Sequence, residues 1–174
     1  MHKRFKAYVY LYLVFFAGCA TPGHDSLSFR FSEADWQRGN TQAVQDKFAI
    51  DEFVRPGETI QTWTELLTIQ RFHKRFVAQP PETLMYALKA RMEQRCPGVV
   101  WQVIQRQEKA ILYEWRIATC PSHPEQHEIA RSLDGEVTLW RLAYTVRGKV
   151  LSAEQREQWI TELAEAKSEF EASR

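Results

Sequence analysis

The chain has 174 residues with 23 basic and 22 acidic side chains, a length that suits one domain with its own hydrophobic core. A charge balance this close to neutral argues against a nucleic-acid partner, because phosphate backbones are bound by clustered basic surfaces. Aromatic residues make up 13% of the chain and include six Trp, which is typical of a core rich in β-sheet. Composition therefore predicts a single folded domain.

The first 18 residues have the organisation of a secretory signal peptide. Lys3, Arg4 and Lys6 precede an uninterrupted apolar run over residues 7–17, which is the order of regions in such signals. The run is shorter than the roughly 20 apolar residues that a membrane-spanning helix needs. No acidic residue lies before position 19, so the rest of the chain carries 20 basic and 22 acidic side chains.

The apolar run ends in Phe16-Ala17-Gly18-Cys19, which resembles the lipobox of bacterial lipoproteins, with Phe16 in place of the usual Leu. In that family the cysteine is lipidated and becomes the mature N-terminus, so the resemblance implies a membrane anchor on Cys19. Each buried methylene of an acyl chain contributes about 0.8 kcal/mol, so several chains anchor a protein stably. Ala20 is not the Asp used for inner-membrane retention, which favours the outer membrane, with the domain facing the periplasm. An ordinary cleaved signal, or a short buried helix, is the alternative.

We expect three parts: the signal peptide 1–18, a lipidated N-terminus and tether 19–40, and a single globular domain 41–174. The polar stretch to about Ser28 opens with Thr-Pro-Gly and is predicted to lift the domain off the membrane. The remainder of the segment, to about Asn40, is a candidate for a first edge element.

Two strands are predicted in the first half of the domain. Apolar side chains alternate over Val44–Val54, the pattern of a half-buried strand, and Pro56-Gly57 then makes a turn. The stretch 62–76 is rich in Thr and Ile, which favours a strand, although its Trp and Leu residues also fit a helical face.

A helix is predicted over residues 82–95. It follows Pro80-Pro81, and Met85, Leu88 and Met92 form an apolar stripe at helical spacing. Cys96-Pro97-Gly98 ends the helix.

The second half of the domain predicts two β-hairpins and a final helix. Alternating runs over 99–106 and 110–118 form the first hairpin, and Asp134-Gly135 marks the turn of the second. Ser152 and Gln155 have the spacing of a capping box, and the apolar stripe that follows consists of Trp159, Ile160, Leu163, Ala166 and Phe170. The order of elements predicts an α+β fold: a mostly antiparallel sheet with two helices packed on one side of it.

Cys96 and Cys120 are the two cysteines outside the lipobox-like motif. In an oxidising compartment such a pair predicts a disulfide, with a stabilisation of about 3 kcal/mol for a loop of this length. The alternative is a metal site: Cys120, His123 and His127 have Cys-x2-His-x3-His spacing, and Cys96 could complete four ligands. Free thiols are the remaining possibility.

No catalytic motif stands out. Candidate nucleophiles are Ser122, Ser132 and Ser152, but none lies in a Gly-x-Ser-x-Gly elbow, and Ser152 is already assigned to the helix cap. Glu58 and Glu65 flank Trp63 and could form a carboxylate pair, whose spacing in space the sequence does not define. Solvent-facing strand charges are the simpler interpretation, so we expect no enzyme activity and no cofactor.

The tryptophans of the predicted apolar faces have two interpretations. These residues are Trp63, Trp101, Trp115, Trp140 and Trp159. Core packing is the default, but two or three that converged on a concave face would make a groove for an apolar ligand or peptide.

Glu58, Trp63, Thr64 and Glu65 lie near the start of a predicted strand. With the order of elements, this arrangement is similar to small periplasmic lipoproteins of the PsbP/Mog1/DcrB-like α-β-α type, over about Val44–Phe170. Those proteins share no single set of catalytic residues, so the resemblance carries none to this chain. We therefore expect a lipid-anchored envelope protein that acts through contacts with a protein partner, as an accessory of an envelope complex. The alternative is a periplasmic module that binds a small ligand or a metal.

Overall fold

The computed structural model describes residues 23–121 and 123–172. The predicted signal peptide, Cys19 and Ser122 lie outside these residues. Within the described ranges, no helix is both long and apolar enough to cross a membrane.

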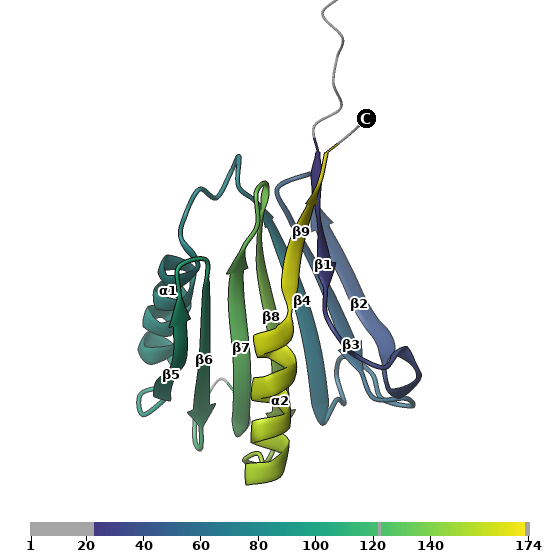
Figure 1. Cartoon of the computed structure of the whole chain (residues 1–174). Helices are drawn as coiled ribbons and strands as arrows, with labels where there is room; N and C mark the ends of the chain where they lie inside the picture. The colour runs from purple at the N-terminus through teal and green to yellow at the C-terminus, as the bar shows by residue number, and fades with distance from the viewer. Residues whose placement is uncertain (1–22, 122, 173–174) are drawn as a thin grey trace, which may run out of the picture.

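The centre of the molecule is a seven-stranded antiparallel sheet (Figure 1). From one edge to the other, its strands are β2 (Gln37–Val44), β3 (Phe48–Val54), β4 (Glu65–His73), β8 (Thr138–Arg147), β7 (Gln126–Asp134), β6 (Ala110–Ile117) and β5 (Val100–Gln107). The prediction of an α+β fold with a mostly antiparallel sheet is confirmed. Both predicted hairpins are present as β5–β6 and β7–β8.

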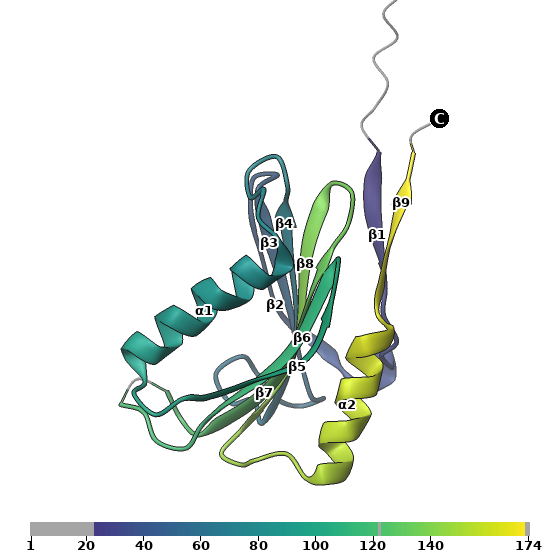
Figure 2. The ribbon, with the colours of Figure 1, turned by 60° about the vertical axis from the view of Figure 1, so that its left-hand side comes forward.

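Helix α1 (Pro81–Arg95) and helix α2 (Ala153–Glu165) cover opposite faces of this sheet, as Figure 2 shows. We call these the α1 face and the α2 face. Two neighbouring residues of β6 point to opposite faces. Tyr113 lies in a buried cluster with Met85 of α1, whereas Leu112 lies in a buried cluster with Trp159 of α2. The prediction that both helices pack on one side is therefore wrong.

The reason for this error is that the central strands are buried on both faces. All the residues between the two ends of β7 and of β8 are buried, including Glu128, Arg131 and Arg141. Charged side chains in a strand are typical of a solvated face, but each of these three makes hydrogen bonds inside the protein. A polar side chain in a strand therefore indicates a solvent-exposed position only when the fold offers it no hydrogen-bond partner inside the protein.

A second, two-stranded sheet joins the two ends of the described chain. Strand β1 (His24–Ser28) pairs antiparallel with β9 (Lys167–Glu171), and a short 3-10 helix, η1 (Glu33–Asp35), precedes β2. Residues 24–40 were predicted as tether and edge element, and 152–170 as one helix. The structure corrects both: β1 lies inside the predicted tether, and the helix ends at Glu165.

Asp25 fixes β1 to the rest of the fold. Its buried carboxylate accepts hydrogen bonds from the backbone N–H groups of Glu136 and Val137 in the β7–β8 turn and of Thr138 at the start of β8. A Cβ atom at Gly135 would come within 2.4 Å of Asp25 Oδ2, so the turn approaches β1 as closely as only glycine allows. Because the sequence of β1 is polar, it was predicted to be a tether rather than a strand bound to the domain.

The predicted strand Val44–Val54 is a hairpin in the structure. A turn at residues 45–47 separates β2 from β3, and Gln45 adopts a left-handed φ of 48°. Val44 then lies opposite Phe48 in the register, so the two side chains remain on one face as the alternation predicted. The alternation of apolar side chains therefore predicted the correct face for these residues, although it did not predict the turn.

Candidate functional site

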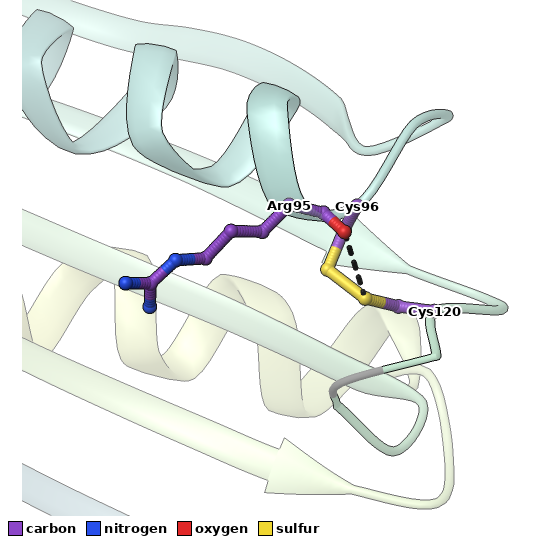
Figure 3. Close-up of a disulfide and its surroundings, with 3 residues drawn as sticks. All are labelled: Arg95, Cys96 and Cys120. Carbon is purple, nitrogen blue, oxygen red and sulfur yellow. Dashed lines mark hydrogen bonds between the residues drawn. A yellow bond between two sulfur atoms is a disulfide. The ribbon is translucent and has the colours of Figure 1, made fainter.

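The disulfide predicted from the cysteine pair is present (Figure 3). Cys96 follows the last residue of α1, Cys120 follows β6, and their Cα atoms are 5.1 Å apart. The Cys120 sulfur lies 3.7 Å from the carbonyl oxygen of Arg95, at the C-terminus of the helix. The bond thus ties the end of α1 to the sheet.

The structure does not support the metal alternative for Cys96, Cys120, His123 and His127. The disulfide uses both sulfurs, so neither cysteine is a thiolate ligand. His127 points into the α2 face, where its Nδ1 accepts a hydrogen bond from the Leu151 amide at 3.2 Å. No group of three or more potential ligands able to hold a metal occurs within residues 23–121 and 123–172.

His127 belongs to a buried polar network on the α2 face. Because its Nδ1 is an acceptor, its Nε2 carries the proton and faces Glu114 Oε2 at 3.3 Å. Arg156 of α2 donates to both oxygens of Glu114, at 2.7 and 3.0 Å. Burial lowers the pKa of His127. Burial alone would raise the pKa of Glu114, but the bonds from Arg156 bring it below its ordinary value.

A concave site lies on the α1 face, beside helix α1. We call it the α1 groove; its volume is about 330 Å³. It is lined by Phe48, Gln70, Phe72, Leu84, Ala87, Leu88, Arg91 and Arg141. Strands β3, β4 and β8 provide its floor and α1 provides its wall. Phe48 and Phe72 lie opposite each other in the register, with ring centroids 5.0 Å apart.

Arg141 supplies a buried positive charge at the base of the α1 groove. Its guanidinium donates to the hydroxyl of Tyr113 at 2.9 Å, to Gln70 Oε1 at 3.2 Å and to Glu128. Burial would lower the pKa of Arg141, but Glu128 and Tyr113 raise it, so the side chain stays charged. These bonds use three of the five N–H groups of an arginine.

Glu128 neutralises Arg141 and is itself held in place. It accepts hydrogen bonds from Trp115 Nε1 at 2.6 Å and from the Thr145 hydroxyl at 3.0 Å. Arg91 at the rim of the groove forms no ion pair with any residue that the structure describes. The groove therefore combines apolar walls with a net positive charge.

The candidate catalytic residues do not come together. Ser132 is fully buried, and Ser152 caps α2 in the predicted capping box with Gln155. Glu65 pairs with Arg55, whereas Glu58 accepts hydrogen bonds from the amide and hydroxyl of Thr64. Partial burial would raise the pKa of Glu58 and of Glu65, but hydrogen bonds from Thr64 and Arg55, respectively, lower each one overall.

The tryptophans are mainly core residues, as expected by default. Trp63, Trp115, Trp140 and Trp159 are buried, and Trp101 is half-buried against Tyr113, with ring centroids 5.7 Å apart. None of them lines the α1 groove.

Sequence reasoning missed the residues that do line this groove. Phe48 lies in the predicted strand Val44–Val54 and Phe72 in the stretch 62–76, which favoured a strand, but nothing in the sequence says that α1 leaves the two rings uncovered. The β3–β4 pairing that brings them together depends on register.

No protein-family model and no curated protein matches this chain. The two features that bear on function are thus the N-terminal sequence with the disulfide, and the α1 groove.

Proposed function

We propose that this chain is a lipid-anchored protein of the bacterial cell envelope, without catalytic activity, that acts through contacts with a protein partner. The observation that carries the proposal is the ending Phe16-Ala17-Gly18-Cys19 of a short apolar run behind three basic residues. The Cys96–Cys120 disulfide supports an oxidising compartment, to which such a signal leads.

A non-catalytic role is supported by the way in which the polar side chains are used. Glu114, His127 and Arg156 bind one another and a backbone amide, and Glu128 and Arg141 bind each other inside the sheet. Groups engaged in this way hold the fold together. A catalytic acid, base or nucleophile has to reach a substrate.

The anchor is tested by expressing the full chain in bacteria fed a labelled fatty acid. We expect label on the wild-type protein and on the Ala20→Ser control, and none on Cys19→Ser. Intact mass should place the N-terminus of the labelled chain at Cys19 and include the acyl groups. A mature chain that begins elsewhere and carries no lipid would contradict the proposal.

The partner is tested by crosslinking in intact envelopes, followed by purification under denaturing conditions. We expect a discrete crosslinked envelope protein with the wild type. Its loss when residues of one surface are replaced would locate the contact. A chain that remains monomeric after crosslinking at several surface positions would contradict action through a protein partner.

The α1 groove favours a second candidate function, the binding of a small amphiphilic anion such as a long-chain carboxylate. Its volume of about 330 Å³ lies at the lower end of the range for ligand pockets, and its apolar walls surround Arg141 and Arg91. Such a ligand would place its chain against Phe48 and Phe72 and its anionic group beside Arg91.

Filling the groove tests this second candidate. Ala87→Trp places a bulky side chain in the groove, whereas Ala90→Trp adds the same side chain to an exposed position of α1 outside the groove lining. Titration with a fluorescent fatty acid should show saturable binding to the wild type and to Ala90→Trp, and none to Ala87→Trp. Equal binding by both variants would exclude the groove as the site.

A further inference from the structure

The start of β1, the end of β9 and several turns lie at the same end of the molecule, as Figures 1 and 2 both show. Direct contacts connect these segments. The carboxylate of Asp25 in β1 accepts a hydrogen bond from the backbone amide of Thr138 at the start of β8. Lys74 donates a hydrogen bond to the carbonyl oxygen of Gly135 in the β7–β8 turn at 2.9 Å. The amide of His73 donates to the carbonyl of Lys47 in the β2–β3 turn at 3.0 Å. We call this the β1 end.

The β1 end is the part of the domain from which the chain leads to Cys19. Only residues 19–23 connect the cysteine to β1, and five residues in full extension span at most about 18 Å. A lipid on Cys19 would therefore hold the β1 end within that distance of the membrane surface. The predicted tether of 19–40 would have allowed a much larger separation.

Phe76 is an exposed aromatic side chain at the β1 end, in the connection between β4 and α1. It is 42% exposed. Two cations lie over its ring: Lys47 Nζ is 5.3 Å from the ring centroid, and the guanidinium carbon of Arg75 is 4.9 Å away. An aromatic ring flanked by basic side chains is typical of a membrane-interface contact, in which the ring enters the headgroup region and the cations meet anionic lipids.

The charges around Phe76 fit this role. Lys74 pairs with Asp134, and Lys109 pairs with Glu136. Neither Lys47 nor Arg75 has an ion-pair partner among the residues that the structure describes. Asp46 and Glu108 are acidic residues of the same turns, so the attraction is local to Phe76 and does not extend over the whole end.

We infer that the surface formed by Lys47, Arg75 and Phe76 contacts the headgroup region of the phospholipid membrane that holds the Cys19 lipid. The inference rests on the proposed lipidation. It gives the domain a defined orientation, because the disulfide lies at the opposite end of the strands, about 30 Å farther from the membrane for strands of nine residues.

Fluorescence quenching by brominated lipids tests this contact. The full chain, processed by the cell and purified from membranes, is reconstituted into phosphatidylcholine–phosphatidylglycerol vesicles with and without brominated acyl chains. Phe76→Trp provides the probe, and Tyr86→Trp is the matched control, because Tyr86 is an exposed aromatic residue on α1. We expect the emission added by Trp at 76 to be lost in brominated vesicles and the emission added by Trp at 86 to persist.

The role of charge is tested by adding Lys47→Glu and Arg75→Glu to the Phe76→Trp chain. Each basic residue near an anionic surface contributes about fivefold to binding, so quenching should fall in phosphatidylglycerol-containing vesicles and change little in neutral ones. Equal quenching at positions 76 and 86 in an acylated, membrane-bound protein would overturn the inference and leave the proposed anchor intact. A purified protein without acyl groups would overturn both.

Discussion

The two faces of the seven-stranded sheet are covered to different extents. On the α2 face, helix α2 and the segment from β1 to η1 close the surface over a core that includes Trp36, Tyr144 and Trp159. The rings of Tyr144 and Trp159 are stacked with centroids 3.9 Å apart. On the α1 face, helix α1 packs on β6 and β7, and the paired rings of Phe48 and Phe72 stay half-buried in the α1 groove.

Each face also contains one buried arginine, and the two are used differently. Arg131 on the α2 face donates to the carbonyl oxygens of Leu163 and Ala166 at 2.8 and 3.1 Å, so it caps the C-terminus of α2. Arg141 on the α1 face is neutralised by Glu128. The α2 face uses its arginine to end a helix, whereas the α1 face holds its arginine in an ion pair at the base of a groove. Stability should therefore depend most on the α2 face, and binding on the α1 face.

Truncating a large ring on each face gives the strongest test of this difference. Trp159→Ala removes a buried ring that stacks on Tyr144 and should cost about 4 kcal/mol of the free energy of unfolding. Phe72→Ala removes a half-buried ring from the α1 groove and should cost about 1 kcal/mol. Urea unfolding followed by circular dichroism measures both. Similar losses for the two variants would show that the groove is as much a part of the core as the α2 face.

Removing the disulfide should destabilise the helix on the α1 face more than the helix on the α2 face. The double variant Cys96→Ser, Cys120→Ser opens a closed loop with a sequence separation of 24 and should lower the free energy of unfolding by about 3 kcal/mol. Because the bond holds only α1, local opening should concentrate there. Hydrogen exchange should become faster in residues 81–95 and stay nearly unchanged in 153–165 under native conditions. Equal acceleration in both helices would show that the disulfide stabilises the sheet as a whole.

Much of the fold was predictable because local signals agree with it. Pro80-Pro81 and the stripe of Met85 and Met92 gave α1, and Ser152 with Gln155 gave the start of α2. The end of α2 was not predictable from its own sequence, because Arg131, 32 residues before Leu163, supplies the cap. The stripe continued to Phe170, but in the structure Phe170 belongs to β9 and is exposed.

The sites were predictable to the extent that they are local in sequence. The disulfide followed from the count of cysteines and the predicted compartment, since Cys96 and Cys120 were the available pair. The α1 groove depends on which part of the sheet α1 covers, and the β1 end depends on Asp25 reaching a turn more than a hundred residues away. Neither arrangement leaves a periodic signal in the sequence.

The buried networks of the two faces should also differ in their response to pH, because only the α2 face network contains a histidine. Burial lowers the pKa of His127 in the folded protein below its ordinary value of about 6.5, so the unfolded chain binds a proton more readily. Its contribution to stability is therefore present above about pH 6.5 and is lost as the pH falls through the pKa of the folded protein. Glu114, with a pKa below 4.5, stays ionised in this range.

We expect the urea midpoint of the wild type to fall between pH 7.5 and pH 5.5, and the midpoint of His127→Asn to change less. The Asn side chain can still accept a hydrogen bond from the backbone amide of Leu151, but it does not titrate. His24→Asn is the control, because that imidazole is exposed in β1, and it should retain the pH dependence of the wild type. If His127→Asn and the wild type lost stability equally over this range, the pH response would come from groups outside the α2 face network, and the two faces would not differ in this respect.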